Sequence, residues 1–208
     1  MHALIKDSRA PGAPYEVALV VSDKPDAAGL RIAQDLGVAT RIVAVDRSID
    51  RSVSRAAYDR TLATTIDEYA PDLIVLAGFM RILSAEFVDR YAGRILNIHP
   101  SLLPKYPGLH THNQALAALD AWHGATVHFV TAELDGGPAV IQARVNVHTD
   151  DDEATLAARV QSTEHRIYPL AVRWYCAGRL RCRDGAAWLD GKPLAGPVLY
   201  DAVALGTN

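Results

Sequence analysis

Between residues 16 and 98, short runs of strand-forming residues alternate with segments of helical periodicity. The predicted strands span residues 16–22, 41–45, 72–79 and 94–98, and the predicted helices span residues 26–37, 50–69 and 84–91. The run DLIVLAGF at 72–79 is almost wholly apolar, which is typical of a strand buried on both faces. Alternation of this kind predicts the α/β class, with a doubly wound, mostly parallel, Rossmann-like sheet.

The pattern changes after residue 120. Two further strands are predicted at 125–131 and 139–147, antiparallel or mixed with the rest, because the intervening AELDGGP contains an Asp-Gly-Gly turn signal. A long helix is predicted to begin near Asp152 and to kink or end at Pro169, since proline removes a backbone donor and clashes with the preceding turn.

The 208 residues are enough for one hydrophobic core, and we expect a single domain over 1–208. We divide it into a nucleotide-side half at about 1–96, a catalytic half at about 97–189 and an irregular tail at 190–208. A small hairpin is predicted within 179–194.

Composition narrows the classes of function. The net charge is −3 and only 22% of residues are charged, so nothing predicts a nucleic-acid surface. Cys176 and Cys182 are too few for a disulfide scaffold or a structural zinc site. No apolar run approaches the ~18 residues of a membrane span, and no signal peptide is recognisable. We expect a cytoplasmic protein, monomer or homodimer, without nucleic-acid or membrane partners.

The stretch NIHPSLLPKYPGLHTH, residues 97–112, places an amide and an imidazole two residues apart at the end of a predicted strand. Asn97 and His99 therefore point to the same face, at the sheet edge where ligands of open α/β sheets bind. Three prolines and a glycine then exclude regular structure and stiffen the loop beside that edge: Pro100, Pro104, Pro107 and Gly108.

An amide and a charged imidazole together suit an oxyanion developing on a carbonyl carbon, where one donor can contribute ~3–4 kcal/mol. A strand-end histidine is nevertheless more often structural than catalytic, unless a partner keeps it charged. Asp135, in the turn after the next strand, is the candidate partner, because a nearby carboxylate favours the charged imidazole. The alternative is that Asp135 is simply a turn aspartate before glycine.

These motifs carry a resemblance. NIHPSLLPKYPGLHTH and HGATVHFVTAELDGGPAVIQARV (123–145) closely resemble the phosphoribosylglycinamide formyltransferases, a folate-dependent family of purine synthesis. The similarity runs from about residue 2 to residue 189. SLLP alone marks a wider set of folate-linked formyl enzymes, whereas its combination with PGLHTH and ELDGGP is much more specific. Further matching stretches are DKPDAAGL (23–30), YDRTL (58–62), AGFMRILS (77–84) and QSTEHRIYP (161–169).

The resemblance implies the formyltransferase fold and transfer of a formyl group from 10-formyltetrahydrofolate to the amine of glycinamide ribonucleotide. It implies that Asn97 and His99 stabilise the oxygen of the tetrahedral intermediate. Asp135 would keep His99 protonated and, with a bound water, return a proton from the attacking amine to the leaving nitrogen. Neither a metal nor a covalent intermediate is implied.

The resemblance also implies binding roles for residues that the sequence pattern alone does not indicate. The folate pocket would comprise Arg55, Met80, Arg81, Ile82, Leu83 and Asn97. Without the resemblance, Met80, Ile82 and Leu83 would be interpreted as core. Gln161 and Glu164, three residues apart on the late helix, would bind the ribose and glycinamide end, although such a pair is usually a solvated helix face.

Histidines near the proline loop are ambiguous. His110 and His112 have a spacing that metal ligands use, but no cysteine lies near and no third ligand is evident. We therefore expect no metal and interpret Pro100, His110 and His112 as walls of the active-site loop, as the resemblance implies. His128 has no assigned role.

The chain departs from the family pattern at its start. The family begins with a strand and a Gly-x-Gly-Ser-Asn loop that binds the substrate phosphate, whereas MHALIKD (1–7) matches the helix that follows that loop. We expect the sheet to be interrupted where the strand would lie, and the ribonucleotide to bind poorly. The corresponding hypothesis is that Met1 is internal and that the natural protein starts about a dozen residues upstream.

Three alternatives remain, of which the first two share the fold, although the hydrolase loop lacks the PGLHTH form. A methionyl-tRNA formyltransferase would carry a further domain and a basic surface, and a formyltetrahydrofolate hydrolase would carry an N-terminal regulatory domain. The third alternative is a truncated homologue that binds folate without turnover.

Overall fold

The structure is a computed structural model that describes residues 1–45, 48 and 51–200. Its helices are α1 (His2–Ser8), α2 (Ala28–Asp35), α3 (Arg51–Asp67), α4 (Ala85–Arg90), α5 (Thr111–Ala117) and α6 (Glu153–Cys176). Its strands are β1 (Leu19–Ser22), β2 (Ala39–Ile42), β3 (Ile74–Leu76), β4 (Ile95–His99), β5 (Trp122–Phe129), β6 (Ala139–Asn146), β7 (Leu180–Arg183), β8 (Ala186–Leu189), β9 (Lys192–Pro193) and β10 (Val198–Tyr200).

The main sheet has the strand order β10-β6-β5-β4-β3. Strand β3 is parallel to β4 and β10 is parallel to β6, whereas β5 is antiparallel to both of its neighbours. A separate parallel pair is formed by β1 and β2, and a small antiparallel sheet by β7, β8 and β9. The predicted α/β class, the antiparallel pair after residue 120 and the C-terminal hairpin are confirmed.

The sheet is interrupted between β1 and β3. Among the described residues these two strands belong to different sheets and share no ladder, as expected from the sequence. The strand predicted at 72–79 is present but shorter, and its side chains pack against buried residues on both faces without being fully buried themselves. Only Ile74–Leu76 are extended, and all three are half-buried, because β3 is an edge strand with a neighbour on one side only.

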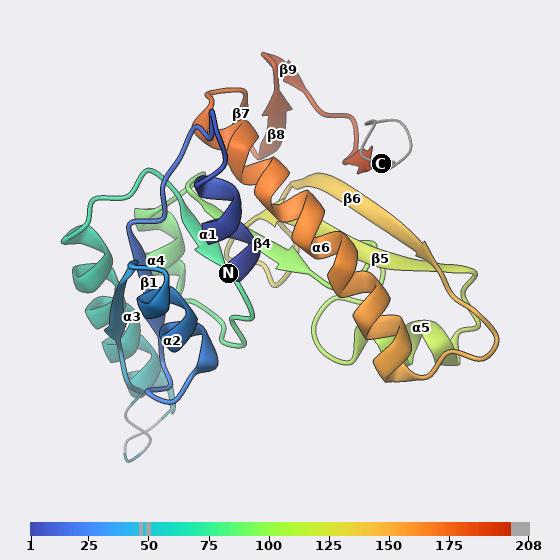
Figure 1. Ribbon diagram of the computed structural model, residues 1–208, viewed down its shortest axis with the longest axis horizontal. Coiled ribbons are helices and arrows are strands. Elements are labelled where there is room, and N and C mark those ends of the chain that lie inside the picture. The colour runs from blue at the N-terminus through green and yellow to red at the C-terminus, as the bar shows by residue number, and fades with distance from the viewer. Residues whose placement is uncertain (46–47, 49–50, 201–208) are drawn as a thin grey trace.

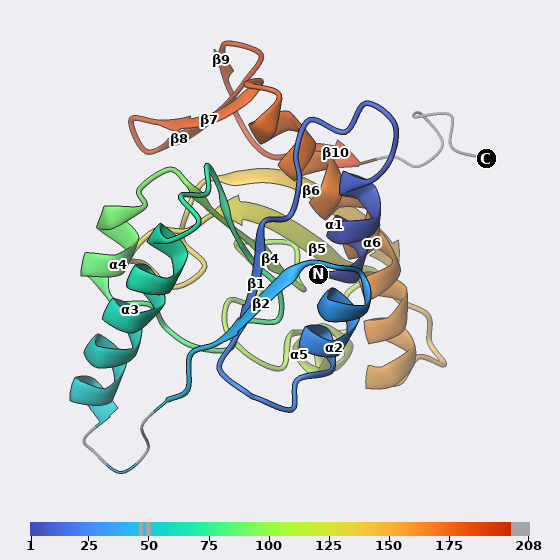
Figure 2. The same cartoon turned by 60° about the vertical axis from the view of Figure 1, so that its left-hand side comes forward.

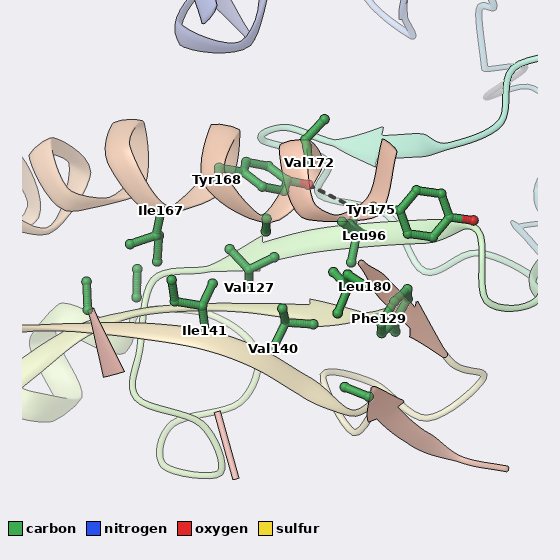
Figure 3. Close-up of a cluster of buried hydrophobic side chains, with 14 of the residues drawn as sticks. Leu96, Val127, Phe129, Val140, Ile141, Ile167, Tyr168, Val172, Tyr175 and Leu180 are labelled. Atoms are coloured by element: carbon green, nitrogen blue, oxygen red, sulfur yellow. Dashed lines mark hydrogen bonds between the residues drawn. The ribbon is translucent and has the colours of Figure 1, made fainter. Parts of the chain in front are cut away.

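Helix α6 packs across one face of the main sheet, as Figure 1 and the close-up in Figure 3 show. Leu96, Val127 and Ile141 from the sheet form one buried cluster with Ile167 and Val172 from the helix. The Tyr168 hydroxyl lies 2.7 Å from the Leu76 carbonyl and 2.9 Å from the Leu96 carbonyl, so it links the helix to β3 and β4.

The predicted start of α6 is confirmed, because the Asp152 side chain accepts a hydrogen bond from the Thr155 N–H in a capping box. The helix does not end at Pro169, however, and continues to Cys176. Pro169 and Ile167 are buried against the sheet, and this packing compensates for the hydrogen bond that proline cannot donate.

Helices α3 and α4 cover the opposite face, on the left in Figure 2. Tyr58 and Leu62 of α3 and Phe87 of α4 form a second buried cluster with Ile95 of β4. Since Leu96 belongs to the first cluster and Ile95 to the second, side chains alternate along β4. Asn97 and His99 therefore lie on the side of Ile95.

Two short elements were not predicted. Helix α5 begins directly after the proline loop, preceded by His110 in the left-handed conformation with φ 59°. Strand β9 pairs with β8, and β10 pairs with β6, so the prediction of an irregular tail over 190–208 is wrong at Lys192–Pro193 and at Val198–Tyr200. Residues 201–208 lie outside the described residues. A three-residue strand carries too little periodicity to be recognised, and its pairing partner is remote in sequence. No helix within the described ranges has both the length and the apolar character needed to cross a membrane.

Candidate active site

The candidate site lies at the carboxyl end of β4, where β4 pairs with β5. Asn97 is opposite His128, and His99 is opposite Thr126. Directly paired residues project to the same face of a sheet, so these four side chains form one group. The prediction that Asn97 and His99 share a face is confirmed.

His99 is 5% exposed, and both of its ring nitrogens face acceptors. Nε2 lies 2.8 Å from the backbone carbonyl oxygen of Tyr106, and Nδ1 lies 3.5 Å from Oδ2 of Asp135. A carbonyl and a carboxylate can only accept hydrogen bonds. Both ring nitrogens of His99 therefore lie opposite acceptors, and Tyr106 supplies its carbonyl from a positive φ of 56°.

Asp135 joins the Asp-Gly-Gly turn to the proline loop. Its backbone has a φ of 51°, and its Oδ2 accepts a hydrogen bond of 2.8 Å from the Gly108 N–H. The same oxygen faces His99, and Oδ1 lies 3.8 Å from His128 Nε2. Asp135 is thus both a turn aspartate and the partner of His99, so the two interpretations of the sequence are compatible.

The loop after His99 is held by side chains that the sequence did not reveal. The Thr126 hydroxyl is fully buried, donates to the Ser101 carbonyl at 2.7 Å and accepts from the Leu103 N–H at 3.0 Å. Gln142 Nε2 donates to the Leu103 carbonyl at 2.7 Å. These contacts join residues 23 to 39 positions apart, and only the pairing of β4, β5 and β6 brings them together.

His112 on α5 and His123 on β5 form a pair, in which Nδ1 of His112 lies 3.1 Å from Nε2 of His123. Burial lowers the pKa of both, that of His123 to about 4. His110 is exposed, and Pro100 accepts a hydrogen bond of 2.6 Å from the Thr111 hydroxyl. Across the described ranges, no group of three or more His, Cys, Asp or Glu residues could hold a metal ion.

A pocket opens beside Asn97, His128 and Asp135. Its other lining residues come from the end of β3, from the segment before α4, from α4 itself and from the turn after β5: Leu76, Phe79, Arg81, Ile82, Leu83, Val88, Val130, Thr131, Ala132, Glu133 and Leu134. The lining combines apolar side chains with polar and charged ones, which fits a flat heteroaromatic ring with hydrogen-bonding edges.

The structure brings only some of the predicted folate residues to this pocket. Arg81, Ile82 and Leu83 line it, and Leu83 also belongs to the second core cluster. Met80 is 78% exposed and does not line it, nor does Arg55, which is half-buried on α3. The backbone from 79 to 83 is irregular, so neither helical nor strand periodicity in the sequence could predict which way each side chain points.

Gln161 and Glu164 lie on α6 and are not among the residues that line this pocket. Gln161 is exposed. Burial raises the pKa of the Glu164 carboxyl, and the Met1 ammonium partly opposes that rise.

An α/β sheet that carries an amide and an imidazole at a strand end, with a carboxylate behind them, is typical of enzymes that stabilise an oxyanion during group transfer. Within that class, the chain belongs to the formyl transferase family, whose profile matches residues 1–172.

Relatives with assigned activities are similar over most of the chain. A phosphoribosylglycinamide formyltransferase of Escherichia coli is 58% identical over 178 residues, which cover 86% of this chain and 82% of that protein. A solved phosphoribosylglycinamide formyltransferase from Coxiella burnetii is 45% identical, with a TM-score of 0.88, and the match covers 96% of this chain and 92% of that one. A formyltetrahydrofolate deformylase from Pseudomonas syringae is 27% identical with a TM-score of 0.74, but only 56% of it is covered.

Proposed function

We propose that this protein transfers the formyl group of 10-formyltetrahydrofolate to the amine of glycinamide ribonucleotide, in the synthesis of purines. The relatives of that name support the proposal, since they match along most of both chains. The observation that carries it is the arrangement of Asn97 and His99 on one face of β4 with Asp135 behind the imidazole.

In the proposed mechanism, Asn97 and His99 donate to the oxygen of the formyl carbon as the amine attacks it. These donors stabilise the negative charge that develops on this oxygen, and one such donor contributes ~3–4 kcal/mol in comparable sites. His99 can donate to it only when its Nε2 exchanges the Tyr106 carbonyl, which it faces in the structure, for the formyl oxygen. Asp135 keeps the imidazole of His99 charged, and its carboxylate, with a water, receives the proton of the attacking amine and returns it to the leaving nitrogen.

Folate binding is proposed for the pocket beside this group. The proposal rests on four residues that line this pocket: Arg81, Ile82, Leu83 and Asn97. Met80 and Arg55 do not line it, so they would contact the folate outside the pocket. For the ribonucleotide we retain Gln161 and Glu164 as proposed contacts of the ribose and glycinamide end. We further propose a cytoplasmic location, a monomer or homodimer, and no nucleic-acid partner.

His99→Ala tests the assignment directly. The change removes the charged donor, so we expect kcat to fall at least about a hundredfold, while the dissociation constant for a folate analogue changes little. His165→Ala, at an exposed position of α6, is the control and should retain wild-type turnover. Formyl transfer and formate release are measured separately, because predominant formate release would indicate a hydrolase. Near-wild-type transfer by His99→Ala would contradict the proposed role.

A further inference from the structure

His128 is a buried titratable group that the proposed mechanism does not use. It lies on β5 directly opposite Asn97 and is 2% exposed. Its Nδ1 lies 2.9 Å from the carbonyl oxygen of Phe129, and its Nε2 lies 3.1 Å from Nδ2 of Asn97. Both ring nitrogens therefore have a partner within hydrogen-bonding distance.

The two partners determine where the proton of His128 lies. A carbonyl oxygen only accepts, so Nδ1 carries the hydrogen that is donated to Phe129. Burial lowers the pKa of His128, so the imidazole is neutral and Nε2 has a free lone pair. This lone pair can only be satisfied by a donor, and the neighbouring donor is the amide nitrogen of Asn97.

The acceptor on His128 thus decides which end of the Asn97 carboxamide faces β5. A carboxamide rotated by half a turn would place its oxygen against the lone pair of Nε2, which is repulsive. With Nδ2 held at His128, one N–H is satisfied and the second N–H remains for another acceptor. No other hydrogen bond of the Asn97 side chain occurs within the described part of the chain, and Asn97 lines the pocket.

We propose that His128 is a positioning residue, which fixes the carboxamide of Asn97 so that its free N–H is presented to the oxygen of the transferred formyl group. This inference rests on the proposed function, because it assigns a support for one of the two donors of that site.

A register shift in the sheet lies directly beside His128. The β5–β6 register shifts between Val127 and His128, so that Val127 pairs with Ile141 and His128 pairs with Ala139. Such a bulge increases local twist and re-aims side chains beside functional sites. The charged or titratable groups facing His128 are Asp135, whose Oδ1 is 3.8 Å from Nε2, and His99.

The test is a double-mutant cycle between His128 and Asn97. His128→Leu removes the acceptor at similar volume, and we expect kcat for formyl transfer to fall about 10- to 100-fold with KM for the folate nearly unchanged. His128→Gln can still present an acceptor oxygen and should recover part of that loss. In an Asn97→Ala background, His128→Leu should cost less than about threefold more, because its effect passes through Asn97.

His123→Leu is the matched buried control. His123 contacts His112 rather than Asn97, so its cost should combine additively with that of Asn97→Ala. If His128→Leu is equally additive, His128 does not act through Asn97 and the inference is overturned. Equal losses for His128→Leu and His128→Gln would overturn it as well.

The protonation state is tested on the wild-type protein, independently of activity and of any variant that fails to fold. Nitrogen-15 NMR of the histidine rings at neutral pH should show His128 with a protonated Nδ1 and an unprotonated Nε2. A proton on Nε2 overturns the inference even if the enzyme is active. If His128 has the expected tautomer but the protein shows no formyl transfer, the proposed function is contradicted, whereas the proposed orientation of Asn97 remains supported.

Discussion

At the residue scale, one carboxylate oxygen of Asp135 serves two partners, the Gly108 N–H and the His99 ring. Asp135→Asn separates these roles, because an amide oxygen can still accept from Gly108 but carries no charge for His99. We expect kcat for formyl transfer to fall about a hundredfold while thermal stability stays close to wild type. Asp190→Asn, which removes an exposed partner of Arg179, should leave turnover unchanged. Wild-type kcat for Asp135→Asn would show that the charge is dispensable.

Some residues of the candidate site could be predicted from the sequence, and others could not. Asn97, His99 and Asp135 were predictable because strand alternation and a turn signal fix where their side chains emerge. Tyr106 was not, because its contribution is a backbone carbonyl delivered by a residue with positive φ. Thr126 was missed because a threonine in a strand is normally interpreted as β-propensity.

At the scale of elements, hydrophobic periodicity predicted the long helices and strands. It missed short elements whose formation depends on pairing or packing with distant parts of the chain. Helix α6 carries enough helical periods to be recognised, although its packing overrode the expected effect of Pro169. Helix α5 is two turns long and follows a segment rich in proline. Strand β10 pairs only with β6 in the described residues, and no feature of the local sequence predicts so distant a partner.

The turn between β5 and β6 requires glycine for space. A Cβ on Gly137 would lie 1.8 Å from the Phe129 carbonyl oxygen, which is the acceptor of His128. We expect Gly137→Ala to lower the free energy of unfolding by about 1–3 kcal/mol, as overpacking against backbone does. Urea unfolding measures the change.

Gly196→Ala is the control for that substitution. A Cβ at Gly196 meets nothing within 4 Å, so the change should be neutral or slightly stabilising. An equal loss of stability in both variants would show that the clash with Phe129 is not the cause, because a Cβ at Gly196 has no neighbour to clash with.

At the scale of the whole molecule, helix packing holds together two sheets that share no ladder in the described ranges. Leu4 of α1 belongs to the same buried cluster as α6, and the Arg173 guanidinium donates to Asp7 at 2.8 Å. Tyr15, in the segment that leads to β1, donates to the same carboxylate at 2.9 Å. The β1–β2 pair is therefore joined to the main sheet through side chains rather than through a continuous ladder.

Stability of the whole molecule should fall in mild acid because of its buried histidines. The pKa of His123 is about 4 in the folded chain and near 6.5 when exposed, so between these values the unfolded state binds more protons. Burial lowers the pKa of His112 and His128 in the same direction, whereas the raised pKa of Glu164 acts in the opposite direction. His123 alone should remove about 2 kcal/mol of the free energy of unfolding between about pH 7.5 and about pH 5.

His123→Gln isolates this contribution, because glutamine keeps a polar side chain at the position and does not titrate. Urea unfolding of wild type and variant at the two pH values gives four free energies. In the difference between the two pH-induced changes, the effects of Glu164 and of other groups remote from His123 cancel, and what remains belongs to His123 together with its partner His112. We expect the variant to be less stable than wild type at neutral pH and to lose less stability on acidification. If both proteins lose the same free energy, His123 takes up its proton equally in the folded and unfolded chains, and the acid sensitivity belongs to other groups.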